Sequence, residues 1–234
     1  MLPYSTLLFD FGGTLADVHP QHEWLYVRAC GEFGVALDPG RAGVSDDFGW
    51  EPYDTPLGPV HLEMSAGEEA FATHKTAVLV DRLQRMGVAG PLEAIAARIY
   101  QLDTEPEMYR IYDEVFPTLE VLRGKGYRMG IISNHEWHLP ALIRGLGLGS
   151  YFNTVVSSAR VGYRKPHPEI FRCVLNDLGC SGNDALMIGD SISSDVKGAI
   201  RVGMPVVLVD REHTSTPVDG VPVVDNLSDL LEFL

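Results

Sequence analysis

Short apolar segments alternate with helical segments from Tyr112 onward, and this alternation constrains the fold more than any other feature of the chain. Five apolar segments predict strands: Arg128–Ser133, Thr154–Ser157, Ala185–Gly189, Pro205–Val209 and Val223–Val224. The segments around them predict helices: Thr118–Lys125, Leu139–Leu146, Pro168–Leu178, Asp195–Val202 and Ser228–Phe233. Strands that alternate with helices build a parallel sheet that is covered on both faces. The sequence therefore predicts an α/β fold.

The N-terminal part follows a different pattern. An apolar strand at Leu7–Phe9 comes first, but from about Asp17 to Glu105 the apolar residues have helical spacing without convincing strand alternation. Within this stretch, Trp50–Pro59 is rich in proline and predicts a loop between helices. We therefore predict an all-α insertion between the first strand and the rest of the sheet, where it could cover a site and select a substrate.

Composition narrows the classes of partner. The 234 residues carry a net charge of −14, which disfavours nucleic-acid binding and means that an anionic substrate must meet local positive charge or a metal. The three cysteines form no CxxC pair and predict reduced thiols. The sequence contains neither a basic N-terminal flank nor a run approaching about 18 apolar residues. We expect a cytoplasmic protein that does not bind membranes, either a monomer or a homodimer.

Asp10 directly follows the first predicted strand and precedes Gly12, Gly13 and Thr14. A carboxylate at the end of a buried parallel strand lies at the edge of the sheet where open α/β folds bind ligands. Such an aspartate can act as a nucleophile. A second carboxylate would be expected two residues on, and Gly12 stands there instead. The predicted nucleophile therefore lacks its obvious general acid/base.

Polar groups also follow three other predicted strands. Ser133 and Asn134 end one strand and offer donors for a phosphoryl oxygen. Lys165 precedes a proline and could neutralise both a carboxylate and a phosphate. Asp190 and Asp195 flank a turn, and carboxylates brought beside Asp10 would repel one another unless a divalent cation such as Mg²⁺ lay between them. Each residue alone has an ordinary structural explanation, but their joint appearance at successive strand ends does not.

These four motifs and their order resemble the haloacid dehalogenase superfamily, with a helical cap inserted after the first motif. The resemblance covers essentially the whole chain. It implies a Rossmann-like parallel sheet core at 1–16 and 106–234, with a helical cap domain at 17–105. It also implies a bound Mg²⁺ ion and a small phosphorylated substrate.

The resemblance assigns roles to individual residues. Asp10 is the implied nucleophile, and Ser133 and Lys165 are implied catalytic and phosphate-binding residues, together with Gly13 and Asn134. The implied metal ligands are Asp10, Asp190, Asp195 and the backbone carbonyl of Gly12.

Gly12 is the departure from the family pattern, because phosphatases of the family carry an acid/base aspartate at that position. General acid/base help is worth about 10²–10⁴-fold, so alkyl phosphates should be poor substrates, whereas acyl and aryl phosphates should suffer least. The candidate replacement donors are Asp17, His19, His22, His135 and Glu136. Trp50, Tyr53 and His61 could line a substrate pocket in the cap.

The favoured function is a Mg²⁺-dependent phosphohydrolase that forms an aspartyl-phosphate. A 2-haloacid dehalogenase is the first alternative, since that branch also lacks the second aspartate, but the acidic pair of Asp190 and Asp195 disfavours it. Cleavage of a carbon–phosphorus bond through a cap lysine ranks last among the enzymes, because Lys75 is well past the early cap position that this branch uses. A catalytically weak binding protein is the alternative from a different class.

Overall fold

The computed structural model describes residues 4–42 and 65–234, so the predicted Trp50–Pro59 loop and the predicted pocket residues Trp50, Tyr53 and His61 lie outside the described residues. Within the described residues a six-stranded sheet has the order β5-β4-β1-β6-β7-β8. Its strands are β1 (Thr6–Phe9), β4 (Arg128–Ser133), β5 (Thr154–Ser157), β6 (Ala185–Gly189), β7 (Val206–Val209) and β8 (Val223–Val224). All neighbouring strands in this sheet are parallel. The predicted α/β fold with a parallel sheet is confirmed.

Both faces of the sheet are buried. Leu7 and Phe9 of β1 belong to one apolar cluster, whereas Leu8 between them belongs to a second cluster on the opposite face. Successive side chains of a strand point to opposite faces, so a strand buried on both sides needs an uninterrupted apolar run. The helices that follow the insertion are α6 (Val115–Gly124), α7 (Leu139–Gly145), α8 (Ser158–Val161), α9 (Pro168–Leu178) and α10 (Lys197–Arg201).

Three predicted helices differ in detail from the structure. The α6 helix begins at Val115 rather than Thr118, because Pro117 lies in its first turn, where a missing N–H costs nothing. The segment predicted as a helix from Asp195 begins as a π-helical turn at Ile192–Val196 before α10. The final predicted helix is a 3₁₀ helix at Leu227–Glu232.

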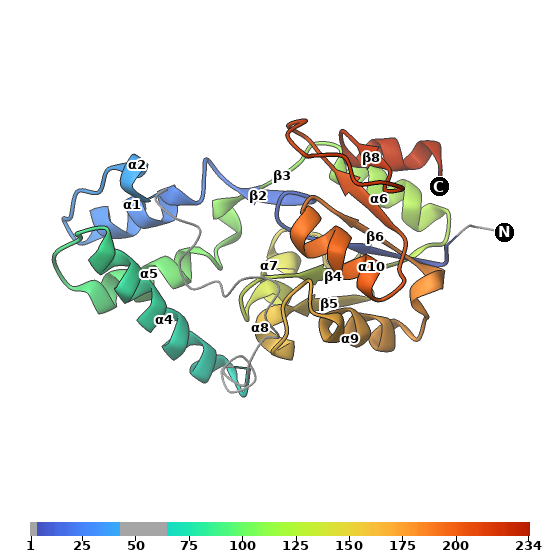
Figure 1. The fold of residues 1–234 in the computed structure, drawn as a ribbon. Coiled ribbons are helices and arrows are strands. Elements are labelled where there is room, and N and C mark those ends of the chain that lie inside the picture. Colours follow the sequence, from blue (N-terminus) through green and yellow to red (C-terminus); the bar gives the residue numbers. More distant parts are fainter. Residues whose placement is uncertain (1–3, 43–64) are drawn as a thin grey trace.

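The inserted stretch contains the helices α1 (Glu23–Glu32), α2 (Pro39–Ala42), α4 (Glu68–Arg85) and α5 (Leu92–Leu102), which lie to one side of the sheet (Figure 1). Leu25, Leu83 and Ile95 are fully buried in a third apolar cluster, to which α1, α4 and α5 contribute. The insertion therefore has its own core, as a helical module should. None of the helices among the described residues is long and apolar enough to span a bilayer.

A two-stranded antiparallel ribbon joins the insertion to the sheet. It pairs β2 (Ala16–Val18) with β3 (Tyr109–Ile111), and Asp17 lies opposite Arg110. The helical pattern predicted from Asp17 onward therefore begins with a strand, which the sequence did not indicate. Each strand has only three residues, and the alternation in Ala-Asp-Val and Tyr-Arg-Ile is too short to distinguish a strand from its surroundings.

Candidate active site

Predicted site residues from separate motifs converge at the carboxyl edge of the sheet. Asp10 follows β1, Ser133 ends β4 and Asp190 follows β6, and these are three neighbouring strands of the sheet. Lys165 reaches the same place from the loop before α9, with its Nζ 2.8 Å from Asp10 Oδ1. Parallel strands end at a common edge, so the sheet order itself gathers these groups.

The Asp10 side chain is held in a defined orientation. Its backbone N–H donates to the carbonyl oxygen of Ile188 over 2.9 Å, which continues the pairing of β1 with β6. Its Oδ1 accepts hydrogen bonds from the N–H of Phe11 over 2.7 Å and from Lys165. These contacts engage Oδ1 and leave Oδ2 as the oxygen suited to a nucleophilic attack.

Lys165 is the positive centre of the site. Its side chain is only 1% exposed, and its Nζ lies 2.6 Å from Asp195 Oδ1 as well as against Asp10. Desolvation lowers the pKa of Lys165, but the carboxylates of Asp10 and Asp195 raise it by more, so that the net shift is upward. Lys165 is therefore an ammonium ion at neutral pH.

The side chain of Asn134 fixes the backbone of Lys165. Its Oδ1 accepts from the Lys165 N–H over 2.7 Å, and its Nδ2 donates to the Lys165 carbonyl over 2.9 Å. This amide is therefore already engaged, and phosphate binding by Asn134 remains a prediction that can involve only its backbone. Ser133 is 4% exposed, and its role as a phosphate ligand also remains a prediction.

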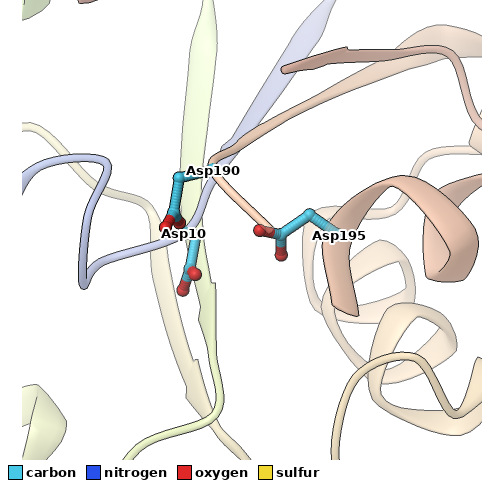
Figure 2. Close-up of side chains that lie close together, drawn as sticks. All are labelled: Asp10, Asp190 and Asp195. Carbon is cyan, nitrogen blue, oxygen red and sulfur yellow. The ribbon is translucent and has the colours of Figure 1, made fainter. Parts of the chain in front are cut away.

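Asp10, Asp190 and Asp195 form a carboxylate cluster in which one oxygen of each lies within 4.8 Å of the others (Figure 2). Burial raises the pKa of Asp190 to about 7, with the charge of Asp10 contributing, and burial raises the pKa of Asp195 to about 6. When all three carboxylates are ionised, the single Lys165 ammonium leaves negative charge uncompensated. Hard oxygen donors with excess negative charge fit Mg²⁺, so this cluster could hold that ion.

The two glycines after Asp10 differ in the space around them. Gly13 has φ +70°, and a Cβ there would clash with the Asp190 carboxylate, so only glycine fits without displacement. Its N–H donates to the Ala16 carbonyl and to Asp17 Oδ1, both over 3.1 Å. Phosphate binding by Gly13 stays a prediction that would require these bonds to be exchanged.

Gly12, in contrast, is exposed, and a Cβ there would meet no heavy atom within 4 Å. The position therefore has room for the side chain that it lacks.

A cleft with a volume of about 820 Å³ opens beside Gly12 and extends to the inserted helices. Gly12, Asn134 and Glu136 line it from the sheet side, whereas Tyr26 and Lys75 line it from the helical side. Lys75 Nζ forms an ion pair of 2.6 Å with Glu136 Oε1, which joins α4 to the loop after β4. The cleft is large enough for an organic group attached to a phosphate.

Lys75, the candidate lysine for carbon–phosphorus cleavage, lines this cleft. Desolvation lowers its pKa, but the carboxylates of Glu136 and Asp103 raise it, and the net shift is upward. Formation of a Schiff base needs a neutral amine, which the ion pair opposes. The charge of Lys75 thus adds to its place in the chain as a reason that disfavours carbon–phosphorus cleavage.

Four of the five candidate replacement donors line the cleft, but three are engaged elsewhere: Asp17, His135 and Glu136. His135 Nδ1 accepts from the Glu136 N–H over 2.8 Å, and its Nε2 lies 3.2 Å from the Tyr109 hydroxyl. The fourth is His22, whose pKa is lowered by desolvation, so that its imidazole is neutral at pH 7.

Several residues that support the site were missed in the sequence. Thr14 Oγ1 donates to Asp190 Oδ1 over 3.3 Å, and Arg211 donates to the carbonyls of Gly13 and Thr14 over 3.1 and 2.8 Å. Tyr112 donates from its hydroxyl to Asp17. Thr14 could have been noticed from its place directly after the glycines, but Arg211 and Tyr112 come from distant loops and have no local signal.

Comparison with known proteins agrees with this arrangement. A family model described as haloacid dehalogenase-like hydrolase matches residues 4–203. Glyceraldehyde 3-phosphate phosphatase from Methanothermobacter thermautotrophicus is 36% identical over 138 residues, which cover 54% of this chain and 60% of that protein. Phosphoglycolate phosphatase from Rhodospirillum rubrum is 34% identical over 128 residues, which cover 53% of each protein.

The matched segments thus span a little over half the length of these relatives. Among solved structures, the fold is similar to that of YfnB from Bacillus subtilis bound to magnesium, with a TM-score of 0.73. The two chains are 21% identical, and the match covers 98% of this chain and 97% of that one.

Proposed function

Because the chain belongs to the haloacid dehalogenase-like hydrolases, we propose that it is a Mg²⁺-dependent phosphohydrolase that forms an aspartyl-phosphate on Asp10. The observation that carries this proposal is the buried Lys165 ammonium, which lies against both Asp10 and Asp195. A cation beside a nucleophilic carboxylate and a cluster of metal-type oxygens is the equipment for binding a phosphoryl group. The phosphatase relatives support a small phosphorylated metabolite as the substrate.

In the first step, Asp10 Oδ2 attacks phosphorus in line with the leaving oxygen. The bond between phosphorus and the leaving oxygen breaks as the acyl-phosphate bond forms. Lys165 and Ser133 hold the equatorial oxygens, and the Lys165 charge also keeps Asp10 ionised. In the second step, water attacks phosphorus, which releases inorganic phosphate and restores the Asp10 carboxylate.

A Mg²⁺ ion held by Asp10, Asp190, Asp195 and the Gly12 carbonyl would supply positive charge to the phosphoryl oxygens. Gly12 supplies no proton to the leaving group, so the rate should depend strongly on how stable that group is as an anion. We therefore propose acyl and aryl phosphates as the best substrates. We also propose that the helices within 17–105 act as a cap that closes the cleft around the organic part of the substrate.

The test is phosphate release from acetyl phosphate, p-nitrophenyl phosphate and glycerol 3-phosphate, each with Mg²⁺ and with chelator. We expect Mg²⁺-dependent release that is fastest for the first two compounds. Asp10→Asn should abolish it, whereas Asp113→Asn should not, because the Asp113 side chain is 91% exposed and is not one of the three clustered carboxylates.

A chloride-release assay on 2-chloropropionate belongs in the same experiment. Release of chloride without phosphate release would favour the dehalogenase alternative and refute the phosphohydrolase. No release from any compound would favour the binding protein.

A further inference from the structure

Arg211 holds the turn that follows the predicted nucleophile. This turn, Phe11–Leu15, contains two successive glycines, which have more backbone freedom than any other pair of residues. Arg211 lies just after β7, and its Nε and Nη2 donate to the carbonyls of Gly13 and Thr14. The planar guanidinium makes the two bonds from two nitrogens held in a fixed fork, a geometry that the single ammonium nitrogen of a lysine lacks.

Arg211 is itself fixed by two further contacts. Its Nη2 forms an ion pair of 2.7 Å with Glu114 Oε1, and its guanidinium carbon lies 3.6 Å from the centre of the Tyr112 ring. The Arg211 side chain is 18% exposed, so these contacts are largely shielded from water. A stacked, paired and partly buried arginine has little freedom to move.

The Tyr112 side chain connects the group that binds the Gly13 N–H with the group that binds the Gly13 carbonyl. Its hydroxyl donates to Asp17 Oδ2, and Asp17 Oδ1 accepts the Gly13 N–H over 3.1 Å. Its ring meanwhile supports the arginine that binds the Gly13 carbonyl. One connected network thus holds the Gly13 residue at both its N–H and its C=O.

The clamped segment touches the site directly. Gly13 packs against the Asp190 carboxylate so closely that no Cβ fits between them, and Thr14 donates to the same carboxylate. Gly12, which precedes the Gly13 and Thr14 carbonyls that Arg211 binds, lines the cleft. Movement of this turn would therefore move the Asp190 carboxylate and the backbone next to Asp10.

From this network we infer that Arg211 is a positioning residue: it fixes the Gly12–Gly13 turn so that Asp10 and Asp190 keep their geometry. The kinetic part of this inference rests on the proposed phosphohydrolase. The structural part does not depend on that function, because it concerns the conformation of the Gly12–Gly13 turn and not the catalytic activity of the site.

The first test is hydrogen exchange of a peptide covering residues 7–16 in Arg211→Gln, Arg211→Lys and the parent chain. Loss of charge-assisted hydrogen bonds should speed exchange in Arg211→Gln by about tenfold or more. Arg211→Lys keeps the charge without the fork and should give an intermediate rate. Equal rates in all three proteins would overturn the inference, and this readout needs no activity.

The second test is kinetic. A misplaced turn should lower kcat about 10–100-fold in Arg211→Gln while KM changes less than about threefold. The matched control is Arg123→Gln, because Arg123 on α6 also pairs with a glutamate and lies 4.7 Å from a tyrosine ring, but its side chain is 47% exposed. The control should retain kcat.

Unchanged kcat in Arg211→Gln, with an active parent protein, would overturn the positioning role. A parent protein with no hydrolysis would instead refute the proposed function, and the exchange experiment would still decide the role of Arg211.

Discussion

Replacing Gly12 with aspartate would return a carboxylate to the position where the phosphatase pattern carries its general acid/base. The side chain has room, since a Cβ at Gly12 meets no heavy atom within 4 Å and the residue lies outside the left-handed region of backbone angles. Gly12 also lines the cleft. We therefore expect Gly12→Asp to fold and to acquire proton-transfer chemistry.

The expected gain follows from the leaving group. General acid/base help is worth about 10²–10⁴-fold, which corresponds to about 3–5 kcal/mol of barrier. For glycerol 3-phosphate we expect the lower end of this range, about 10²-fold. The neighbouring side chains of Asp17 and Tyr112 bond to Gly13 and to each other, so they do not orient a new carboxylate at Gly12. For acetyl phosphate, whose leaving carboxylate needs no proton, the gain should stay below about threefold.

Steady-state phosphate release with Mg²⁺ measures both gains. Gly12→Asn provides the matched control, since it has the same shape without a transferable proton. The reasoning would be refuted by equal gains in Gly12→Asp and Gly12→Asn, or by a gain that does not depend on the leaving group.

Three further predictions concern stability and ion binding. Gly13→Ala should lower the free energy of unfolding, measured in urea, by roughly 2–4 kcal/mol, because it adds a clash with Asp190 to an unfavourable φ. The control Gly87→Ala has a similar φ of +73° but open space around the Cβ, so it should lower the free energy of unfolding by only about 1 kcal/mol. Lys75→Met should cost roughly 2 kcal/mol, less than a fully buried pair because the lysine side chain is 25% exposed, and adding Glu136→Gln should recover part of the loss in a double-mutant cycle. Burial raises the pKa of Asp190 to about 7, so protons should compete with Mg²⁺ for this carboxylate at lower pH. The rise in melting temperature on adding about 10 mM Mg²⁺ should therefore be larger at pH 8 than at pH 6.

Burial on both faces explains why the sheet could be predicted from the sequence. A strand such as β4 must be apolar where both of its faces are buried, and a polar residue marks its end at the carboxyl edge of the sheet, so Ile131, Ile132 and Ser133 carry the signal themselves. The convergence of Asp10, Lys165, Asp190 and Asp195 follows from this sheet and from the family resemblance.

The remaining features depend on contacts that leave no local pattern. Arg211 lies 197 positions from the Thr14 carbonyl that it binds, and nothing around Arg211 distinguishes it from a surface arginine. Asn134 was predicted as a phosphate ligand from its place after a strand, but its amide is matched to a backbone 31 positions away. Hydrogen-bonding side chains can be located by sequence, whereas their partners are chosen by the tertiary structure.

The β2–β3 ribbon has a consequence for how the inserted helices can move. Both covalent connections between these helices and the sheet pass through one short antiparallel ladder, with Val18 opposite Tyr109 and Ala16 opposite Ile111. Two strands hydrogen-bonded side by side bend together and slide past one another only if their bonds break. The helices should therefore move relative to the sheet as one unit, about the single hinge that this ribbon forms. Asp17, the central residue of β2, accepts the Gly13 N–H, so the hinge is bonded to the turn beside the carboxylate cluster.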